Sequence, residues 1–206
     1  MSKDQNVHLI IRNTRPDDVE EIVKLQKESF PTLARYVNIW HPDELKSHLQ
    51  GTWVDLGQFI AIGEDGEVIG SADPEYAEPT WKGIISNGMF ADCNPNGDSP
   101  YGADISTRPA YGHEGIGSML YGARKELVLM RRMISGWRLF NCQDYADKRS
   151  ASEYADKVIN GELNDPVLSF ELANGFKFIK ILPNYLEPRS RNYASFIEWL
   201  NPLFRY

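Results

Sequence analysis

The sequence of 206 residues has little cysteine and a deficit of basic side chains. Its two cysteines, Cys93 and Cys142, cannot build a disulfide framework, so we expect a reducing compartment. Lys and Arg number 22 against 29 Asp and Glu, which gives a net charge of −7. A dedicated nucleic-acid-binding protein needs a clustered basic face, so this balance argues against that class. It fits a protein that attracts cationic small molecules.

Long apolar segments are also absent. No stretch approaches the roughly 18 consecutive apolar residues that a membrane span requires. The first six residues are polar and lack the apolar segment of a secretory signal peptide. We therefore expect a cytoplasmic protein that does not bind membranes. The length, with 42% hydrophobic residues, predicts a single domain over residues 1–206.

The pattern of apolar residues and turn signals predicts interleaved strands and helices. Asp65-Gly66 predicts a hairpin, Ser150 with Glu153 a capping box, and Asp165-Pro166 the start of a helix. We expect strands at 7–11, 58–62, 68–72, 101–107, 134–141, 176–182 and 194–200, and helices at 15–30, 42–50, 119–133, 151–161 and 166–173. Residues 77–102 are rich in Pro, Asn and Gly and predict a long loop. This order favours one mixed α/β domain.

The most informative segment is ISTRPAYGHEGIGS at residues 105–118, between a predicted strand and a long helix. A glycine-containing turn at a helix start presents unpaired backbone N–H groups, which together with the helix dipole favour a diphosphate. Gly115 and Gly117 let the backbone approach a ligand without a Cβ in the way. Glycine at such turns also serves tight packing, so the spacing alone leaves both interpretations open. The segment matches neither a P-loop nor a Rossmann turn.

Further motifs give this segment a context. Pro109, Tyr111, Gly115 and Gly117 have the spacing of a strand, an aromatic residue and Gly-x-Gly before a helix. Residues 168–176, LSFELANGF, form a short predicted helix that ends in Gly-Phe. With the opening at 10–18, this layout resembles the GNAT superfamily of acyl-CoA-dependent N-acyltransferases over roughly residues 9–200. Residues 165–186 are most similar to the GNAT domain fused to carbon–nitrogen hydrolases in some bacteria.

The resemblance implies a mixed sheet with helices on both faces, and acetyl-CoA as cosubstrate. It implies that the strand backbone binds the thioester oxygen and the pantetheine arm, that the turn holds the diphosphate, and that Arg124 or Lys125 reaches the 3′-phosphate. The alternative for both basic residues is a solvated helix face. The implied cofactor contacts are Ile105, Ser106, Thr107, Gly112, His113, Glu114, Gly115, Ile116, Gly117, Ser118, Arg124 and Asn141, the last at the end of the following strand.

The resemblance also implies direct attack of an amine on the thioester, which needs a base. We favour Asp104, whose alternative role is a structural carboxylate paired with an arginine, and Glu171 is the second candidate. Tyr145 and Tyr111 are the candidate acids. Three positions depart from the family pattern. Gly112 replaces a Gln or Arg, Glu114 stands where a basic residue is frequent, and Glu171 stands where a tyrosine often acts as acid.

Residues 142–164 look like an insertion beside the expected acceptor pocket, either a specificity element or surface decoration. We expect the acceptor to be an amine of a small molecule or peptide, with no nucleic-acid partner. No metal is expected, because the histidines lack partners at ligand spacing. Two alternatives stay open: a non-catalytic acyl-CoA-binding regulatory module, and a partner subunit of a separate hydrolase. A homodimer is compatible with the sequence.

Overall fold

The computed structural model describes residues 9–31, 42–50, 57–75, 99–126, 131–185 and 190–204. Helices and strands alternate along these ranges, as the sequence predicts for an α/β protein. In chain order they are β1 (Ile10–Asn13), η1 (Pro16–Asp18), α1 (Val19–Ser29), α2 (Pro42–Gln50), β2 (Phe59–Ile62), β3 (Val68–Glu75), β4 (Tyr101–Thr107), η3 (Pro109–Tyr111), α4 (Ile116–Lys125), β5 (Arg132–Arg138), η4 (Cys142–Tyr145), α5 (Ala151–Ile159), α6 (Leu168–Ala173), β6 (Lys177–Leu182) and β7 (Ala194–Leu200).

These elements form two compact units. The first holds the described residues of 9–74 and 104–126, and the second holds 75, 99–103 and the described residues of 131–204. Strand β4 begins in the second unit and ends in the first. Each unit therefore draws on chain segments that are far apart in sequence.

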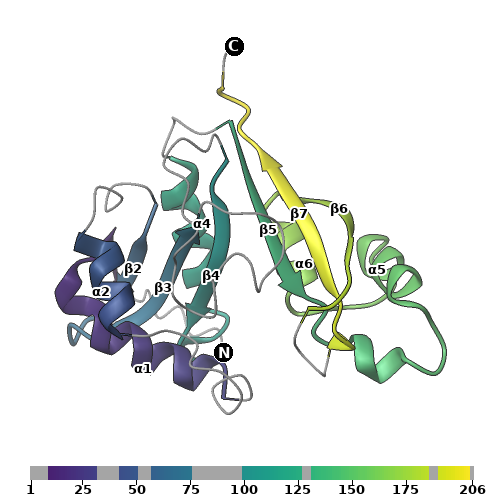
Figure 1. Ribbon diagram of the computed structural model, residues 1–206, viewed down its shortest axis with the longest axis horizontal. Coiled ribbons are helices and arrows are strands. Elements are labelled where there is room, and N and C mark those ends of the chain that lie inside the picture. The colour runs from purple at the N-terminus through teal and green to yellow at the C-terminus, as the bar shows by residue number, and fades with distance from the viewer. Residues whose placement is uncertain are drawn as a thin grey trace, which may run out of the picture. The chain divides into compact units, whose positions relative to one another are not determined.

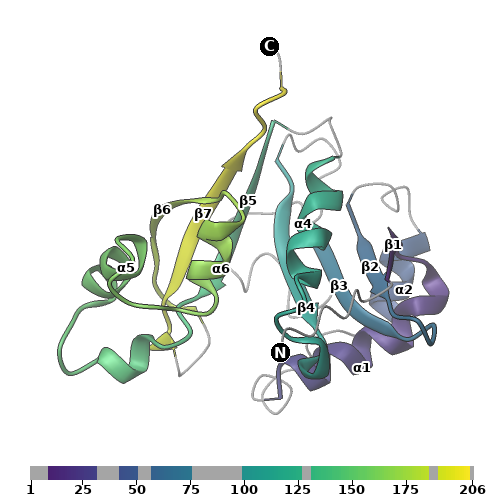
Figure 2. The same ribbon diagram turned by 180° about the vertical axis from the view of Figure 1, so that it is seen from behind.

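The first unit is a sheet with helices on both faces. Strand β1 pairs antiparallel with β2, β2 pairs antiparallel with β3, and β4 follows β3 in the strand order. Helices α1 and α2 lie on one face of these strands and α4 on the other (Figures 1 and 2). On the α4 side, Ile116 and Leu120 pack against Phe59, Ala61 and Ile69.

A glycine on β3 lets α4 approach the sheet closely. A Cβ on Gly70 would lie 2.8 Å from Cγ2 of Ile116 and 3.2 Å from the carbonyl oxygen of Ser106. Neither distance leaves room for a side chain, so Gly70 determines how near the first turn of α4 lies to β3. The position of α4 is thus set at the end of the helix that the sequence marks as a ligand site.

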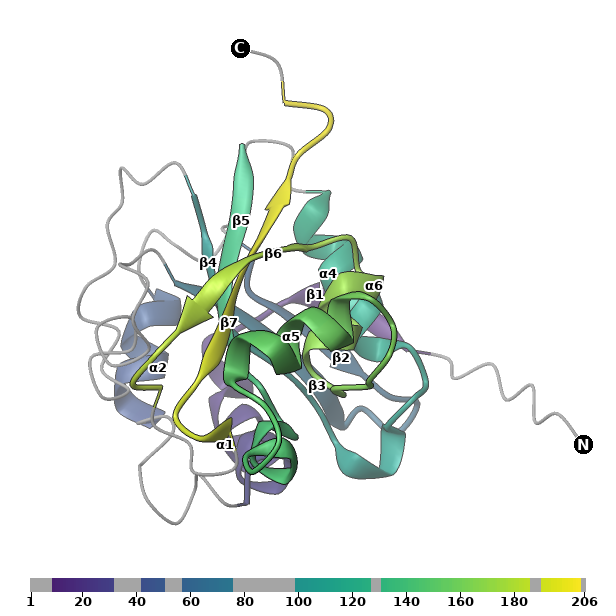
Figure 3. The ribbon, with the colours of Figure 1, turned by 90° about the vertical axis from the view of Figure 1, so that its right-hand side faces the viewer.

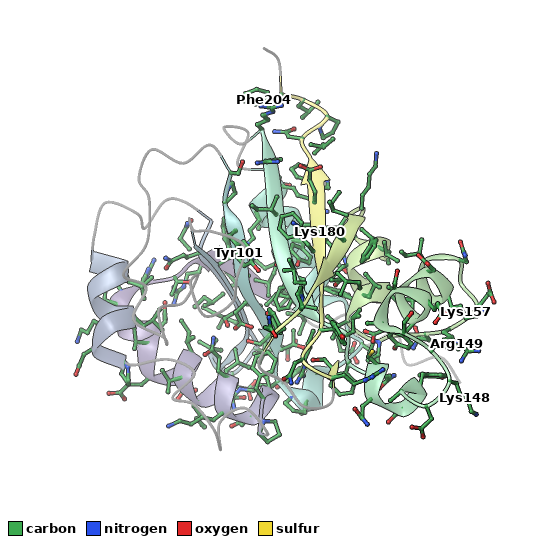
Figure 4. The ribbon with its side chains drawn as sticks, turned by 45° about the vertical axis from the view of Figure 1, so that its right-hand side comes forward. Tyr101, Lys148, Arg149, Lys157, Lys180 and Phe204 are labelled. Carbon is green, nitrogen blue, oxygen red and sulfur yellow. The ribbon has the colours of Figure 1, made fainter. Side chains whose placement is uncertain are left out.

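The second unit has its own strand pairings. The start of β4 pairs parallel with β5, Tyr101 opposite Ile134, and β7 pairs antiparallel with both β5 and β6. Figure 3 shows α5 and α6 beside β6 and β7. Tyr101, labelled in Figure 4, is fully buried, and a Cβ on Gly136 of β5 would lie 2.4 Å from its hydroxyl oxygen.

Most predicted elements are confirmed within a few residues, and the predicted first helix divides into the short helix η1 and α1, which begins at Val19. The long helix is not confirmed at its predicted length. Helix α4 ends at Lys125, whereas Arg132 and Met133 belong to β5. Arg132 pairs with Leu200 of β7, and Met133 is buried. The predicted strand at 134–141 begins earlier and ends at Arg138. Of the predicted loop at 77–102, residues 77–98 lie outside the described residues, as do residues 7 and 8 of the strand predicted at 7–11. The described part of that strand is β1, which begins at Ile10 and continues to Asn13.

Candidate functional site

The turn between β4 and α4 places backbone donors at the protein surface. Gly115 is the N-cap of α4 and has φ of 77°, and no side chain caps the helix. The N–H of Met119 donates to the Gly115 carbonyl at 3.0 Å, so the N–H groups of Ile116, Gly117 and Ser118 precede the first intrahelical donor. The turn itself, from Gly112 to Gly115, is exposed. These donors sit at the positive end of the α4 dipole and suit an anion.

Two polar side chains of this turn, those of His113 and Glu114, are exposed to solvent. His113 is a non-glycine residue with φ of 70°. Solvent screening reduces the repulsion that the Glu114 carboxylate would exert on a nearby phosphate. The carboxylate that departs from the family pattern is therefore compatible with an anion at the helix start.

The start of the turn is held by a buried arginine that the sequence analysis did not single out. The guanidinium of Arg108 forms ion pairs with Glu21 and Glu28 at 2.9 Å each and with Glu67 at 3.2 Å. Its Nε donates to the carbonyl of Val68 at 2.8 Å. Only 8% of the side chain is exposed, against 36–44% for the three carboxylates. Arg108 thus ties the end of β4 to α1 and to the β2–β3 hairpin.

Arg124, the predicted 3′-phosphate contact, points inward. It is 2% exposed, and its Nε donates to the carbonyl of Gly57 at 3.0 Å. A second nitrogen of its guanidinium donates to the backbone carbonyl of Asp104 at 3.4 Å. These contacts give Arg124 a structural role beside β4, which neither of the two interpretations made from the sequence had included.

Asp104 lies on β4 with its side chain toward α1. Its neighbour Ile105 packs into the cluster beneath α4, so alternation along the strand turns Asp104 to the other face. Oδ2 of Asp104 accepts from Nε2 of Gln26 at 2.7 Å and from the hydroxyl of Ser106 at 3.2 Å. The Ser106 hydroxyl is in turn 3.2 Å from that of Ser71. These four side chains form a buried polar cluster within the first unit.

The remaining predicted site residues, Glu171, Tyr145 and Asn141, belong to the second unit. Glu171 is 1% exposed on α6. Tyr145 is half-buried, and the centroid of its ring lies 5.3 Å from that of Tyr154. The guanidinium of Arg149 lies over the Tyr145 ring. The backbone N–H of Asn141 donates to Oδ2 of Asp165 at 3.1 Å.

Asp165 organises the segment 142–164. Its Oδ1 accepts from the N–H groups of Val167 and Leu168, which confirms the predicted cap at this helix start. Its Oδ2 accepts from the hydroxyl of Tyr154 at 2.7 Å. Burial, and then this hydrogen bond, raise the pKa of Tyr154, and burial raises the pKa of Cys142. Figure 4 shows Lys148, Arg149 and Lys157 on this segment, and the capping box of Ser150 with Glu153 begins α5 as predicted.

Two findings concern the described ranges only. They contain no group of three His, Cys, Asp or Glu side chains able to hold a metal ion. They also contain no helix that is long and apolar enough to cross a membrane.

The fold and this turn define an α/β protein in which a glycine-containing turn leads from β4 into α4, and the chain is similar to known proteins. The chain is 34% identical over 205 residues to the uncharacterized N-acetyltransferase YkwB of Bacillus subtilis, covering 96% of this chain and 91% of that protein. It is 38% identical over 205 residues to the probable hydrolase YhcX of Bacillus subtilis, covering 94% of this chain but only 39% of that protein.

A solved structure agrees in fold. The GphF GNAT-like decarboxylase in complex with isobutyryl-CoA superposes with a TM-score of 0.75 at 17% identity, covering 93% of this chain and 99% of the other. No protein-family model matches the chain. The relative of nearly equal length, together with this fold, shows that the chain belongs to the GNAT family of acyltransferases. The resemblance proposed from the motifs is confirmed.

Proposed function

We propose that this protein transfers an acyl group, acetyl in the first instance, from acyl-CoA to the amine of a small molecule or peptide. The observation that carries the proposal is the start of α4, where Gly115 in the left-handed region begins the helix and the N–H groups of Ile116, Gly117 and Ser118 precede its first intrahelical donor. These groups suit the diphosphate of a nucleotide thioester. Gly112, His113 and Glu114 complete the proposed cradle.

In the proposed reaction, the acceptor ammonium loses a proton to Asp104. The neutral nitrogen then forms a bond to the thioester carbonyl carbon, the carbon–sulfur bond breaks, and the sulfur leaves as CoA thiolate. The second proton of the nitrogen passes to the thiolate or to solvent. We propose that backbone N–H groups of Ile105, Ser106 and Thr107 face the thioester and pantetheine, and that donors placed there oppose the charge that develops on oxygen.

The other predicted site residues have subordinate roles in this proposal. Arg124 is a positioning residue, because its buried guanidinium supports the Asp104 backbone and is directed away from solvent. Glu171 is the second candidate for the base, Tyr145 the candidate acid, and Asn141 a further cofactor contact. The protein is proposed to act in the cytoplasm, as one GNAT domain over residues 1–206 in which 142–164 is inserted.

Binding and turnover test the proposal separately. Titration calorimetry with CoA and acetyl-CoA measures binding, and release of free thiol measures turnover with spermidine, butylamine and a tripeptide that begins with alanine. We expect saturable binding of both nucleotides and thiol release with at least one amine. Absence of binding would contradict the acyl-CoA site itself.

A non-catalytic acyl-CoA-binding module is the second candidate, and two observations favour it. Glu171 stands where the resemblance implies a tyrosine, and Glu114 adds a negative charge beside the proposed diphosphate. Saturable binding of acetyl-CoA without thiol release from any amine of the panel would favour this module over the transferase.

A subunit that assembles with a separate hydrolase is a further candidate. It is favoured by YhcX, of which the chain spans only 39%. Purification of the tagged protein from its own cells would test it. Recovery without an associated hydrolase would count against it.

A further inference from the structure

Gln26 is an unusual residue for its position on α1. It is 1% exposed and lies among the buried residues Val19, Ile22, Val23 and Leu25 on the inner face of an amphipathic helix. Its Nε2 donates a hydrogen bond to Asp104. Its Oε1 is buried and accepts no hydrogen bond from any described residue. A buried acceptor without a donor destabilises a fold, and an apolar side chain would pack here without that cost.

The cluster around Gln26 converges on one oxygen atom. Gln26 Nε2 and the Ser106 hydroxyl both donate to Oδ2 of Asp104, and Ser71 lies behind Ser106 on the neighbouring strand β3. Asp104 is 4% exposed. Donors from a helix and from the strand itself stop the carboxylate from rotating. Local sequence rules are broken most often where a functional group must be held.

We propose that Gln26 is a positioning residue, which holds the Asp104 carboxylate in the orientation that takes the proton of the acceptor amine. Ser106, supported by Ser71, is the second holder of the same oxygen. The inference rests on the proposed function, because it assigns Gln26 a role only through Asp104. It goes further in naming a residue on α1, 78 positions away in sequence, that controls the rate of the chemical step.

Gln26→Leu removes the donor and leaves an apolar side chain of similar size. We expect kcat to fall about tenfold, which is part of the roughly 10²- to 10⁴-fold that proton transfer by a positioned group contributes. The dissociation constant for acetyl-CoA should stay within about twofold, because Gln26 lies away from the α4 turn. Stability should change little, because removal of the unsatisfied Oε1 is opposed by the loss of one donor to the buried Asp104 carboxylate. Gln26→Met provides a second apolar variant should the leucine variant not fold.

The decisive measurement is a double-mutant cycle with Asp104→Asn, using the most active amine of the panel. In the Asp104→Asn background, Gln26→Leu should change kcat less than about twofold, because there is no carboxylate left to orient. Gln58→Leu is the matched control, since Gln58 is also a buried glutamine of the first unit whose Oε1 accepts no hydrogen bond from any described residue. Its kcat should remain that of the wild type.

The outcomes separate the two proposals. An active wild type whose Gln26→Leu variant keeps full kcat, or loses kcat equally with and without the Asp104 carboxylate, overturns the role of Gln26 and leaves the transferase intact. A wild type that binds acetyl-CoA but releases no thiol with any amine overturns the transferase and this role together. A fall in kcat confined to the background that contains Asp104, with acetyl-CoA binding unchanged, supports both.

Discussion

Gly115 is the residue on which the proposed nucleotide site depends most directly. Its φ of 77° is disfavoured for any residue with a Cβ, while no atom lies within 4 Å of where a Cβ would be. Gly115→Ala should therefore destabilise the protein by about 1 kcal/mol through backbone strain. It should also weaken acetyl-CoA binding at least about tenfold in calorimetry. The backbone would shift to relieve the strain, and the N–H groups of the first turn of α4 would then change direction.

Gly66 offers a matched control for this prediction. It has φ of 81° in the β2–β3 turn and equally open surroundings. Gly66→Ala should cost similar stability and leave acetyl-CoA binding unchanged. If Gly115→Ala and Gly66→Ala both bound acetyl-CoA as tightly as the wild type, the turn before α4 would not be part of the proposed site.

Arg108 gives a second prediction at the residue scale. A lysine cannot reproduce the planar fork that contacts Glu21, Glu28 and the Val68 carbonyl together. Arg108→Lys should lower the free energy of unfolding by about 2 kcal/mol in urea titration, a figure reduced because the carboxylates are partly exposed. Acetyl-CoA affinity should fall as well, since the start of the turn loosens.

Lys24→Gln is the control for Arg108. Lys24 forms an exposed pair with Glu21 at 3.9 Å, and its loss should change stability by less than about 0.5 kcal/mol. A loss for Arg108→Lys no larger than this would show that the buried guanidinium does not hold the end of β4.

The sequence predicted the turn but not the side chains that support it. The glycines and Pro109 lie within a few residues of one another, so their spacing could be read directly. Arg108 meets Glu28 across 80 positions and Asp104 meets Gln26 across 78. Such pairs depend on which helix packs over which strand, and a single sequence carries no local signal for that. Gln26 on an apolar helix face was the one visible irregularity.

At the scale of elements, the α5–α6 segment provides a prediction that depends on pH. Tyr154 and Cys142 both hold their protons more tightly in the folded protein, because burial raises the pKa of each. The stability they contribute is therefore present below their unfolded values, about 8.5 for Cys and about 10 for Tyr, and is lost as pH rises above them. The free energy of unfolding should fall between about pH 8 and pH 10.5.

Tyr154→Phe should make that fall shallower, because one of the two groups is gone. At neutral pH the variant should lose about 1 kcal/mol, the hydrogen bond to Asp165. Tyr145→Phe is the control, with no hydroxyl bond to Asp165, and should keep the wild-type dependence on pH. An unchanged slope in Tyr154→Phe, measured by denaturation across the pH series, would contradict the role of the Tyr154 proton.

Cap signals in the sequence located two helix starts to within two residues. The capping box of Ser150 and Glu153 and the cap by Asp165 each begin a helical segment as expected. The helix predicted to reach Met133 failed because the apolar residues around that position fit a helix and a buried strand equally well. Residues 132–138 form a strand because they pair with β7, from Arg132 to Arg138. This pairing joins distant parts of the chain, so the local sequence carries no signal for it.

At the scale of the whole molecule, the sequence predicted one mixed α/β fold and its family, and comparison confirms both. The grouping into two compact units was not predicted, because β4 contributes its first residues to one unit and its last to the other. Composition and periodicity describe stretches of chain, whereas a compact unit is defined by contacts between distant stretches.

The net charge of −7 leads to a prediction for the proposed transferase as a whole. A negatively charged protein attracts cations, and salt screens this attraction over a Debye length of about 10 Å at about 0.1 M. With acetyl-CoA saturating, kcat/KM for spermidine should fall steeply as salt rises from about 20 to about 200 mM, whereas kcat/KM for the singly charged butylamine should fall less. Thiol release measured along this salt series compares the two slopes. Equal slopes would mean that the acidic balance plays no part in capturing the acceptor, because long-range attraction scales with the charge that the amine carries.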